Sequence, residues 1–259
     1  MNMLRTNLMN GTETRRVYDQ KGKFSVIGAI NPRDTGYNPQ FFDPAKGGVG
    51  VSKRQLVYEL DGSRGIIVQA GVMHMMIGEI NAATDIKGAG DFVKKAFASK
   101  ATGESAVKPK YTGKGLFVFE STRKHILLMD ASEWQGGLVI EDGLFLAAED
   151  TLNLSVVARS TLSSAALGGE GLFNTCITGS GICALESRVP YSELIEVILD
   201  NDVIKIDGSY AVAWSNSLQF TVEKTTKSLI GSAASGEGLV NVYRGTGRIL
   251  ISPSCCCFD

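Results

Sequence analysis

One stretch of the chain occurs in three copies, and this repetition restricts the possible folds more than any other feature of the sequence. GKGLFVFESTRKHILLMD begins at Gly113, GEGLFNTCITGSGICALE at Gly169 and GEGLVNVYRGTGRILISP at Gly236. The first and third copies align without a gap, and the second carries one extra residue near Thr178. A motif repeated in this way indicates a recurring structural unit rather than a single active site.

An Asp-Gly pair precedes each copy, and an apolar stretch follows each pair. The three pairs are Asp61-Gly62, Asp142-Gly143 and Asp207-Gly208. Asp tolerates the left-handed backbone region and Gly enters it without steric cost, so each pair predicts a turn ahead of a strand.

The first unit has the longest interval between its Asp-Gly pair and its glycine motif, which predicts an insert within residues 82–110. Residues 90–100 would place Phe92, Val93 and Phe97 on one helical face. We therefore expect a short helix here that packs against the sheet. A single helical turn is expected after Pro190.

The third copy has the composition of β-strands. Its pieces LVNVYR and RILIS are short and rich in β-branched and apolar residues. Gly245-Thr246-Gly247 separates them and predicts a hairpin turn, because glycine can take the positive φ that tight turns need. Gly179-Ser180-Gly181 is the matching segment of the second copy. We expect the apolar side chains of this hairpin to contact the core, namely Leu239, Val242, Ile249 and Ile251.

These patterns together predict an all-β fold. Residues 1–50 are interpreted as an N-terminal extension and loop, because residues 31–50 are rich in proline and glycine. Residues 51–259 are expected to form a single all-β domain. Its three related units, at about 51–132, 133–187 and 188–259, are expected to stack in a pseudo-threefold arrangement.

The charge balance argues against nucleic-acid partners. The chain has 26 basic and 27 acidic residues, for a net charge of −1. No basic stripe interleaved with aromatic residues stands out in the sequence. We therefore expect no DNA binding and disfavour RNA binding.

The cysteines and the hydropathy pattern indicate a cytoplasmic protein. The five cysteines are crowded into two regions, unlike the dispersed pattern of a secreted disulfide framework. The sequence shows no signal peptide and no run of about 18 apolar residues that would span a membrane.

The Gly-x-Gly-Leu opening, the segment ending in RILISP and the stretch YAVAWSNSLQF resemble the altered-inheritance-of-mitochondria 24 family over about residues 51–253. This family is widespread in bacteria, where its members have no known function. The resemblance implies an all-β fold similar to the tryptophan RNA-binding attenuation protein, with related β units repeated in one chain. It implies no catalytic residues. The insert in the first unit and the Cys-Cys-Cys-Phe-Asp tail depart from the family.

The glycine motifs do not match phosphate-binding loops. A dinucleotide fingerprint needs a third glycine that opens a helix, and a P-loop needs Gly-Lys-Ser or Gly-Lys-Thr. Here strands follow the glycines. Lys114, Glu170 and Glu237 also occupy one equivalent position with opposite charges, so turn formation is the preferred interpretation.

The two histidines do not define a catalytic or metal site. His125 is expected in an exposed position at the start of a strand, and no Gly-x-Ser-x-Gly elbow supplies a nucleophile. His74 lies among Met73, Met75 and Met76, which could suit copper(I). Alternate strand residues point to opposite faces, however, so Met73 and Met75 would share a face without His74. Core filling by these methionines is preferred.

Cys255, Cys256 and Cys257 are expected to be free thiols in a tail outside the core. A closed zinc site takes four ligands, and three adjacent residues of one segment do not easily surround a tetrahedral ion. We therefore assign no catalytic, cofactor-binding or metal residue and expect no cofactor.

Two hypotheses for the function follow. The first is a non-catalytic β-scaffold that assembles with copies of itself, as a homo-oligomer, or with other proteins. The second is a module that binds a small molecule or single-stranded RNA in a groove between units. We favour the first and do not expect an enzyme.

Overall fold

The computed structural model describes residue 8 and residues 15–29, 53–83, 108–158, 173–207, 210–224 and 239–253, which fold almost entirely as β-strands. The all-β prediction is confirmed. The first sheet contains β1 (Arg15–Lys21), β2 (Phe24–Ala29), β3 (Arg54–Asp61), β4 (Ile66–Val68), β5 (Met73–Ala83), β6 (Lys110–Phe119), β7 (His125–Asp130), β9 (Phe145–Glu149) and β12 (Ile182–Ser187). The second contains β8 (Leu138–Ile140), β10 (Asn153–Ala158), β11 (Phe173–Thr178), β13 (Ile195–Asp207), β14 (Ala211–Ser215), β15 (Gln219–Lys224) and β16 (Leu239–Ile251).

The first sheet curls until its two end strands approach each other. Its strands follow the order β1-β2-β3-β6-β4-β9-β12-β7, with β5 added on β6. β1 and β7 stand at opposite ends of this order, yet they lie next to each other in space. No backbone ladder joins them within the described part of the chain, so an open seam runs between two strand edges.

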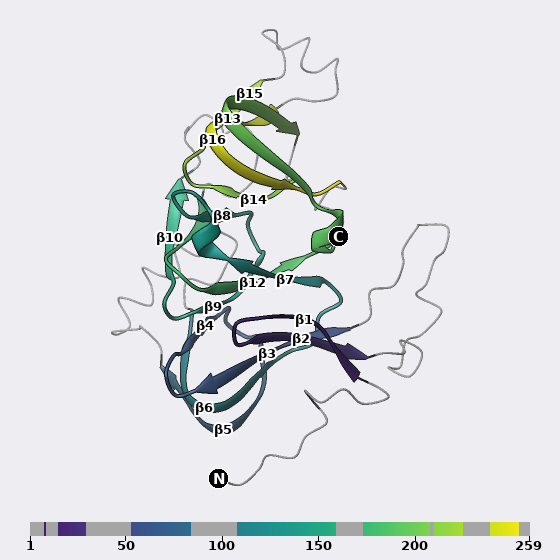
Figure 1. The fold of residues 1–259 in the computed structure, drawn as a ribbon, viewed down its shortest axis with the longest axis vertical. Helices are drawn as coiled ribbons and strands as arrows, with labels where there is room; N and C mark the ends of the chain where they lie inside the picture. The colour runs from purple at the N-terminus through teal and green to yellow at the C-terminus, as the bar shows by residue number, and fades with distance from the viewer. Residues whose placement is uncertain are drawn as a thin grey trace.

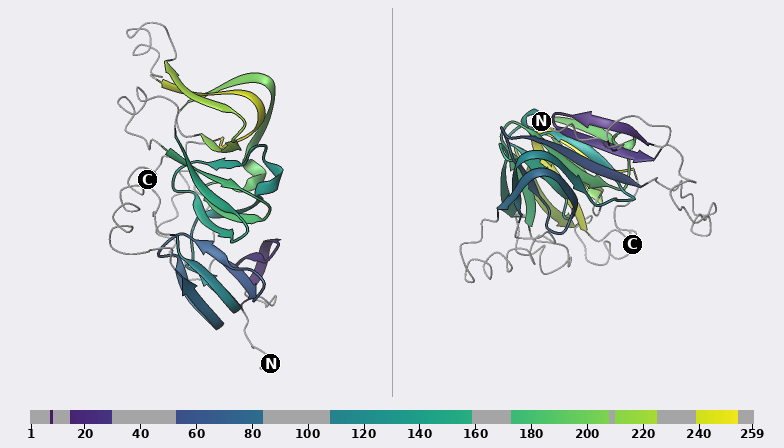
Figure 2. Two further views of the ribbon diagram at one scale, coloured as in Figure 1. Left: turned by 90° about the vertical axis from the view of Figure 1, so that its left-hand side faces the viewer. Right: turned by 90° about the horizontal axis from the view of Figure 1, so that it is seen from below.

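The strands stack in layers along the long axis of the molecule (Figures 1 and 2). β1 to β6 lie at one end, β7 to β12 in the middle and β13 to β16 at the other end (Figure 1). Buried apolar side chains fill the space within and between these layers, with Tyr58 and Phe117 in the first cluster, Leu138 and Leu185 in the second, and Trp214 and Tyr243 in the third. Burial of this apolar surface supplies the main driving force for the stacked arrangement.

The hairpin predicted at Gly245-Thr246-Gly247 is wrong, because β16 runs through these residues as one strand. The long strand β13 pairs with both halves of β16, and the register shifts between Leu199 and Asp202, opposite the glycines. Gly245 has φ +118°. The glycines therefore lie opposite a bulge in β13 while β16 itself continues, and long-range pairing with β13 makes a chain reversal unnecessary.

The matching segment of the second copy does not form a hairpin either. Gly179-Ser180-Gly181 connects β11 to β12, and these two strands belong to different sheets. The glycines thus turn the chain from one sheet into the other. Gly169 and Gly236 lie outside the described residues, so the pseudo-threefold arrangement of the three glycine motifs stays a prediction.

Part of the expected N-terminal extension belongs to the first sheet. β1 and β2 form a hairpin with a two-residue turn at Gly22-Lys23, and β2 then pairs with β3. The hairpin forms because Gly22, at φ +56°, supplies the turn between the two strands. The loop at 31–50 and the expected helix at 90–100 lie outside the described residues.

Other local predictions are confirmed. Gly62 and Gly143 have φ of +89° and +75° in turns, whereas Gly208 lies outside the described residues. Pro190 caps a single turn of 3-10 helix, η5 (Tyr191–Glu193). A second such turn, η4 (Ala131–Glu133), follows β7. Val242 and Ile249 are fully buried, and Ile251 packs against the cluster that contains Ile249, as expected for core contacts of β16. The side chain of Leu239, expected with them, is not among those described.

Candidate binding groove and strand edge

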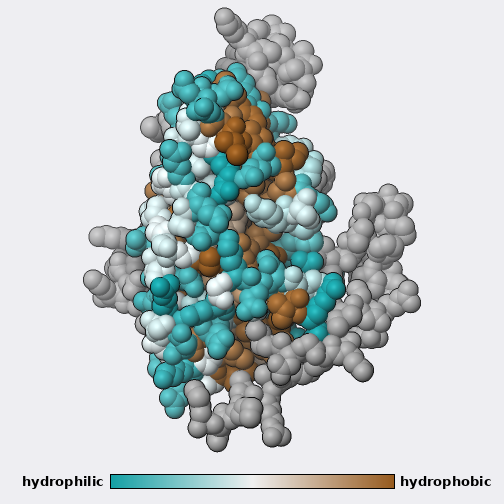
Figure 3. Space-filling view, in the orientation of Figure 1, coloured by the Kyte–Doolittle hydropathy of each residue, from teal (hydrophilic) through white to brown (hydrophobic). Residues whose placement is uncertain are grey.

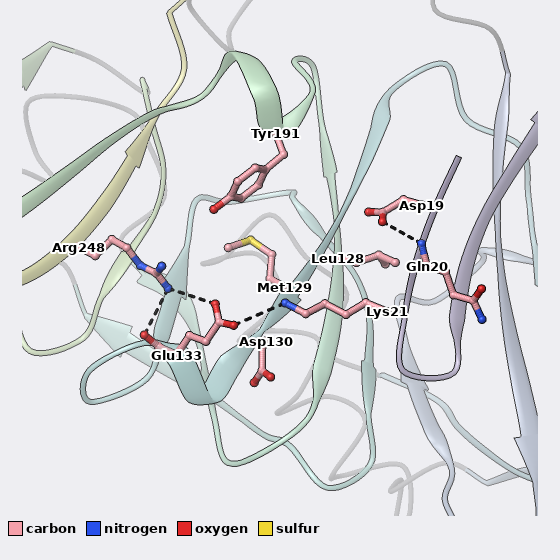
Figure 4. Close-up of a pocket in the computed structure, with 9 residues that line it drawn as sticks. All are labelled: Asp19, Gln20, Lys21, Leu128, Met129, Asp130, Glu133, Tyr191 and Arg248. Carbon is pink, nitrogen blue, oxygen red and sulfur yellow. Dashed lines mark hydrogen bonds and ion pairs between the residues drawn. The ribbon is translucent and has the colours of Figure 1, made fainter. Parts of the chain in front are cut away.

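A groove of about 370 Å³ lies at the seam between β1 and β7 (Figure 4). It joins parts of the chain that are distant in sequence, because β1, β7, η4, η5 and β16 all contribute. Its lining residues are Asp19, Gln20, Lys21, Leu128, Met129, Asp130, Glu133, Tyr191 and Arg248. The sequence analysis identified none of these residues.

Glu133 connects the two sides of the groove. Its carboxylate lies 3.8 Å from the Nζ of Lys21 on β1 and 3.8 Å from the Nη2 of Arg248 on β16. Arg248 also donates to the Glu196 carboxylate at 3.1 Å, and its guanidinium lies 4.2 Å from the centre of the Trp134 ring. Arg248 therefore contacts Glu133, Glu196 and Trp134. Figure 4 shows that ion pairs connect Arg248 through Glu133 to Lys21.

Strand edges rather than a closed ladder form the walls of this groove. The backbone N–H of Gln20 donates to the carboxylate of its own neighbour Asp19 at 2.8 Å. A side chain that satisfies an edge N–H in this way replaces a missing strand partner. On the opposite wall, hydrogen bonds from the N–H and hydroxyl of Ser132 hold the pKa of Asp130 below its usual value, against the effect of burial.

The groove contains two basic and three acidic side chains beside the apolar surfaces of Leu128, Met129 and Tyr191. Histidine, cysteine and serine are absent from this lining set. The groove can therefore bind a small polar molecule through ion pairs and hydrogen bonds. Within the described residues, no group of three His, Cys, Asp or Glu side chains is placed to hold a metal ion.

A second candidate site is the edge of β13, the end strand of the second sheet, which pairs with no strand other than β16 among the described residues. Ile198 is 75% exposed, and Ile195 and Val203 on the same strand are also exposed. Tyr191, in the turn just before β13, is exposed too. Figure 3 shows apolar surface along the course that β13 takes in Figure 1.

One histidine lies in a different environment from the one expected. His125 starts β7 as predicted but is half-buried rather than exposed; burial and the nearby Arg54 charge lower its pKa. His74 is exposed, and its Nδ1 lies 3.2 Å from the Nε2 of Gln55.

Two of the three methionines around His74 are not core residues. Met73 and Met76 are exposed, whereas Met75 packs against a buried cluster. The register between β5 and β6 shifts from Met73 to Met75. This bulge at His74 interrupts the alternation of faces on which the core assignment depended.

Cys176 and Cys183 are free and buried. Burial raises the pKa of Cys183 to about 12 and also raises that of Cys176. Neither thiol is therefore a nucleophile at neutral pH. Cys255, Cys256 and Cys257 lie outside the described residues.

A family comparison covers most of the chain. Residues 49–254 match the model of the family described as mitochondrial biogenesis AIM24. The chain belongs to the AIM24 family. The match begins close to the predicted domain boundary at residue 51, so the β1–β2 hairpin lies outside the matched region although it completes the first sheet.

Two streptococcal proteins are similar to this AIM24 family member. An uncharacterised protein of Streptococcus pyogenes serotype M6 is 26% identical over 201 residues, which are 74% of this chain and 78% of that protein. The crystal structure of a Streptococcus pyogenes protein has a TM-score of 0.58 at 22% identity and covers 93% of this chain and 94% of the other. The second likeness shows the fold alone.

The described residues of this family member contain no helix that is long and apolar enough to cross a membrane.

Proposed function

We propose that the protein is a non-catalytic β-scaffold that assembles with a second copy of itself through the first half of β13. The observation that carries the proposal is Ile198, which is 75% exposed on the end strand of a sheet. An end strand presents unpaired N–H and C=O groups that can pair with another strand. Large apolar side chains on such an edge add hydrophobic stabilisation to that pairing.

The first half of β13 is suited to pairing with its own copy. Residues 195–199 contain a single charged side chain, Glu196, and Arg248 already neutralises it at 3.1 Å. An antiparallel pairing centred on Val197 places Glu196 of one copy beside Ile198 of the other, so like charges do not meet. Such a contact is two-fold symmetric and closes on itself.

The second half of β13 limits the length of this contact. The strand bulges at Asn201, which has φ +52°, and acidic residues Asp200 and Asp202 flank the bulge. Bulges and charges on an edge oppose continued strand pairing. The expected assembly is therefore a discrete dimer and not an open fibre.

The apolar contribution can be estimated from the side chains involved. Full burial of one isoleucine stabilises by about 1.5–3 kcal/mol, and a symmetric contact buries Ile198 twice. Tyr191, which is 52% exposed, lies in the turn just before β13, and Ile195, which is 51% exposed, lies on the opposite face of the strand from Ile198. This area has to offset the loss of translational and rotational freedom on association.

Sedimentation equilibrium of the full chain tests the proposal. We expect a dimer for the natural protein and at least a tenfold weaker association for Ile198→Lys. Val156→Lys is the matched control, because Val156 is 55% exposed on β10 at the other end of the same sheet. A monomeric natural protein, or equal weakening by both substitutions, would contradict the proposal. Circular dichroism melting verifies that both variants fold.

A second candidate function is the binding of a small molecule, and the groove of about 370 Å³ at the β1–β7 seam favours it. A ligand that binds only the folded protein raises its apparent stability. A thermal-shift screen of small polar metabolites on the natural protein and on Lys21→Gln tests this candidate. Loss of the shift in Lys21→Gln would support the groove as the site, and an unchanged shift would place the ligand elsewhere.

A further inference from the structure

Two arginines of the first sheet pack on one tyrosine ring. The guanidinium carbon of Arg16, on β1, lies 4.3 Å from the centre of the Tyr18 ring. The guanidinium carbon of Arg54, on β3, lies 4.7 Å from the same centre. Stacking on an aromatic face holds a guanidinium through cation–π attraction. Tyr18 thus brings together two positive charges from strands that are not neighbours.

The register of the sheet explains how the ring reaches this position. Arg16 pairs with Gly28, and Gly28 pairs with Arg54, so the three residues form a row across β1, β2 and β3. The central residue has no side chain, and a Cβ at Gly28 would lie 2.8 Å from the Cε2 of Tyr18. The ring fills the space left by glycine, between two arginines about 9–10 Å apart at their backbones across two strand spacings.

Within the part of the chain that the structure describes, no carboxylate neutralises the charges of this row. Among the described residues, neither Arg16 nor Arg54 has an ion-pair partner, and the same holds for the adjacent Lys53 and Arg123. The Nε of Arg54 is buried and donates no hydrogen bond. An unsatisfied buried donor costs about 1–3 kcal/mol, more when charged, so this arrangement reduces stability.

We propose that Arg16 and Arg54 form a clamp that binds the phosphate groups of an anionic ligand. Guanidinium groups present planar, paired N–H donors that match the oxygens of phosphate, and they keep their charge at all physiological pH values. The Tyr18 ring fixes both groups before the ligand arrives, which lowers the entropic cost of binding. Phosphate groups of this kind come either from a soluble diphosphate or from the headgroup of a lipid.

The experiment uses two probes, inorganic diphosphate and phosphatidylcholine vesicles that contain phosphatidic acid. Calorimetry at low salt measures the first, and vesicle flotation measures the second. We expect binding in at least one arm, with at least a tenfold loss of affinity in Arg16→Gln/Arg54→Gln. Binding of diphosphate identifies a soluble ligand, and binding of vesicles alone identifies a lipid headgroup; either result supports the clamp.

Arg64→Gln is the control, because Arg64 follows the opposite end of β3 and forms an ion pair of 4.0 Å with Glu149. It removes one equal charge and should bind like the natural protein. Tyr18→Phe should also retain binding because it keeps the ring. No binding in either arm, or equal losses in Arg64→Gln and in the double variant, would overturn the proposal. Melting curves of all variants separate lost binding from lost folding.

Discussion

The guanidinium of Arg248 lies 4.2 Å from the centre of the Trp134 ring, and this contact connects β16 to the middle of the molecule. Trp134 is buried in the second core cluster, whereas Arg248 belongs to β16. The same arginine donates to Glu196 at the start of β13. One side chain therefore supports both the groove and the proposed dimer edge.

Replacing Arg248 with glutamine should lower the free energy of unfolding. The loss of a largely buried cation–π contact and of two ion pairs, with Glu133 and Glu196, is expected to cost about 1–2 kcal/mol. Urea denaturation followed by tryptophan fluorescence measures the change. Arg64→Gln, which removes an exposed arginine at 4.0 Å from Glu149, should change the free energy by less than about 0.5 kcal/mol. Equal effects would show that the Trp134 contact contributes little.

Valine at Gly245 should destabilise the protein through backbone strain. Gly245 has φ +118°, a region that β-branched residues avoid, so the expected cost is about 1–3 kcal/mol. Valine at Gly247 should also destabilise, but through crowding, because a Cβ there would lie 2.9 Å from the Cβ of Ser215.

Gly143→Ala tests the cost of a positive φ without steric crowding of the side chain. Gly143 has φ +75° and no atom within 4 Å of a Cβ, so this substitution should cost only about 1 kcal/mol. Thermal denaturation of the three variants gives the order, with Gly143→Ala the most stable. A Gly245→Val protein as stable as the natural chain would show that β16 does not need the positive φ of Gly245.

Cys183 should be unreactive in the folded protein, because burial raises the pKa of its thiol to about 12. A variant with serine at 255, 256 and 257 leaves Cys176 and Cys183 as the remaining thiols. We expect almost no reaction with a disulfide reagent at pH 8 until denaturant is added, followed by two equivalents. Rapid labelling without denaturant would contradict the buried positions. The triple variant should also melt at nearly the natural temperature.

Asp61 should make the stability depend on pH in the acid range. Hydrogen bonds from Lys23 and Ser63 hold its pKa well below the usual value. A lowered folded-state pKa contributes stability above the unfolded value of about 4, and this stability is lost as the pH falls through the folded value. Asp61→Asn should therefore be less stable than the natural protein at pH 6, with the difference shrinking below about pH 4. A difference that does not vary with pH would exclude this linkage.

The sequence predicted those structural features that depend only on residues adjacent in the chain. The turns at Gly62 and Gly143, the helical turn after Pro190 and the all-β class follow from such signals. The hairpin predicted at Gly245 is wrong because glycine also occurs in a continuous strand opposite a bulge, and the pairing of β16 with β13 lies outside the local sequence.

The candidate sites depend on contacts that no short stretch of sequence contains. Lys21 and Arg248 meet at Glu133 because the first sheet curls and β16 reaches the middle layer. Tyr18 lies between its two arginines because of the register through Gly28. The sequence did contain an indication of the β1–β2 hairpin, because residues typical of β-strands lie on both sides of Lys-Gly-Lys at 21–23.

Disulfide cross-linking at position 197 tests the proposed assembly most directly. In an antiparallel pairing centred on Val197, this residue faces its own copy, with Cα atoms about 4.5–5.5 Å apart, a distance that a disulfide can span. In the variant with serine at 255, 256 and 257, Val197→Cys should therefore give a covalent dimer on mild oxidation. Asn201→Cys, four residues from the axis, should stay monomeric on a non-reducing gel. Absence of the dimer for Val197→Cys, or equal cross-linking at both positions, would contradict assembly through β13.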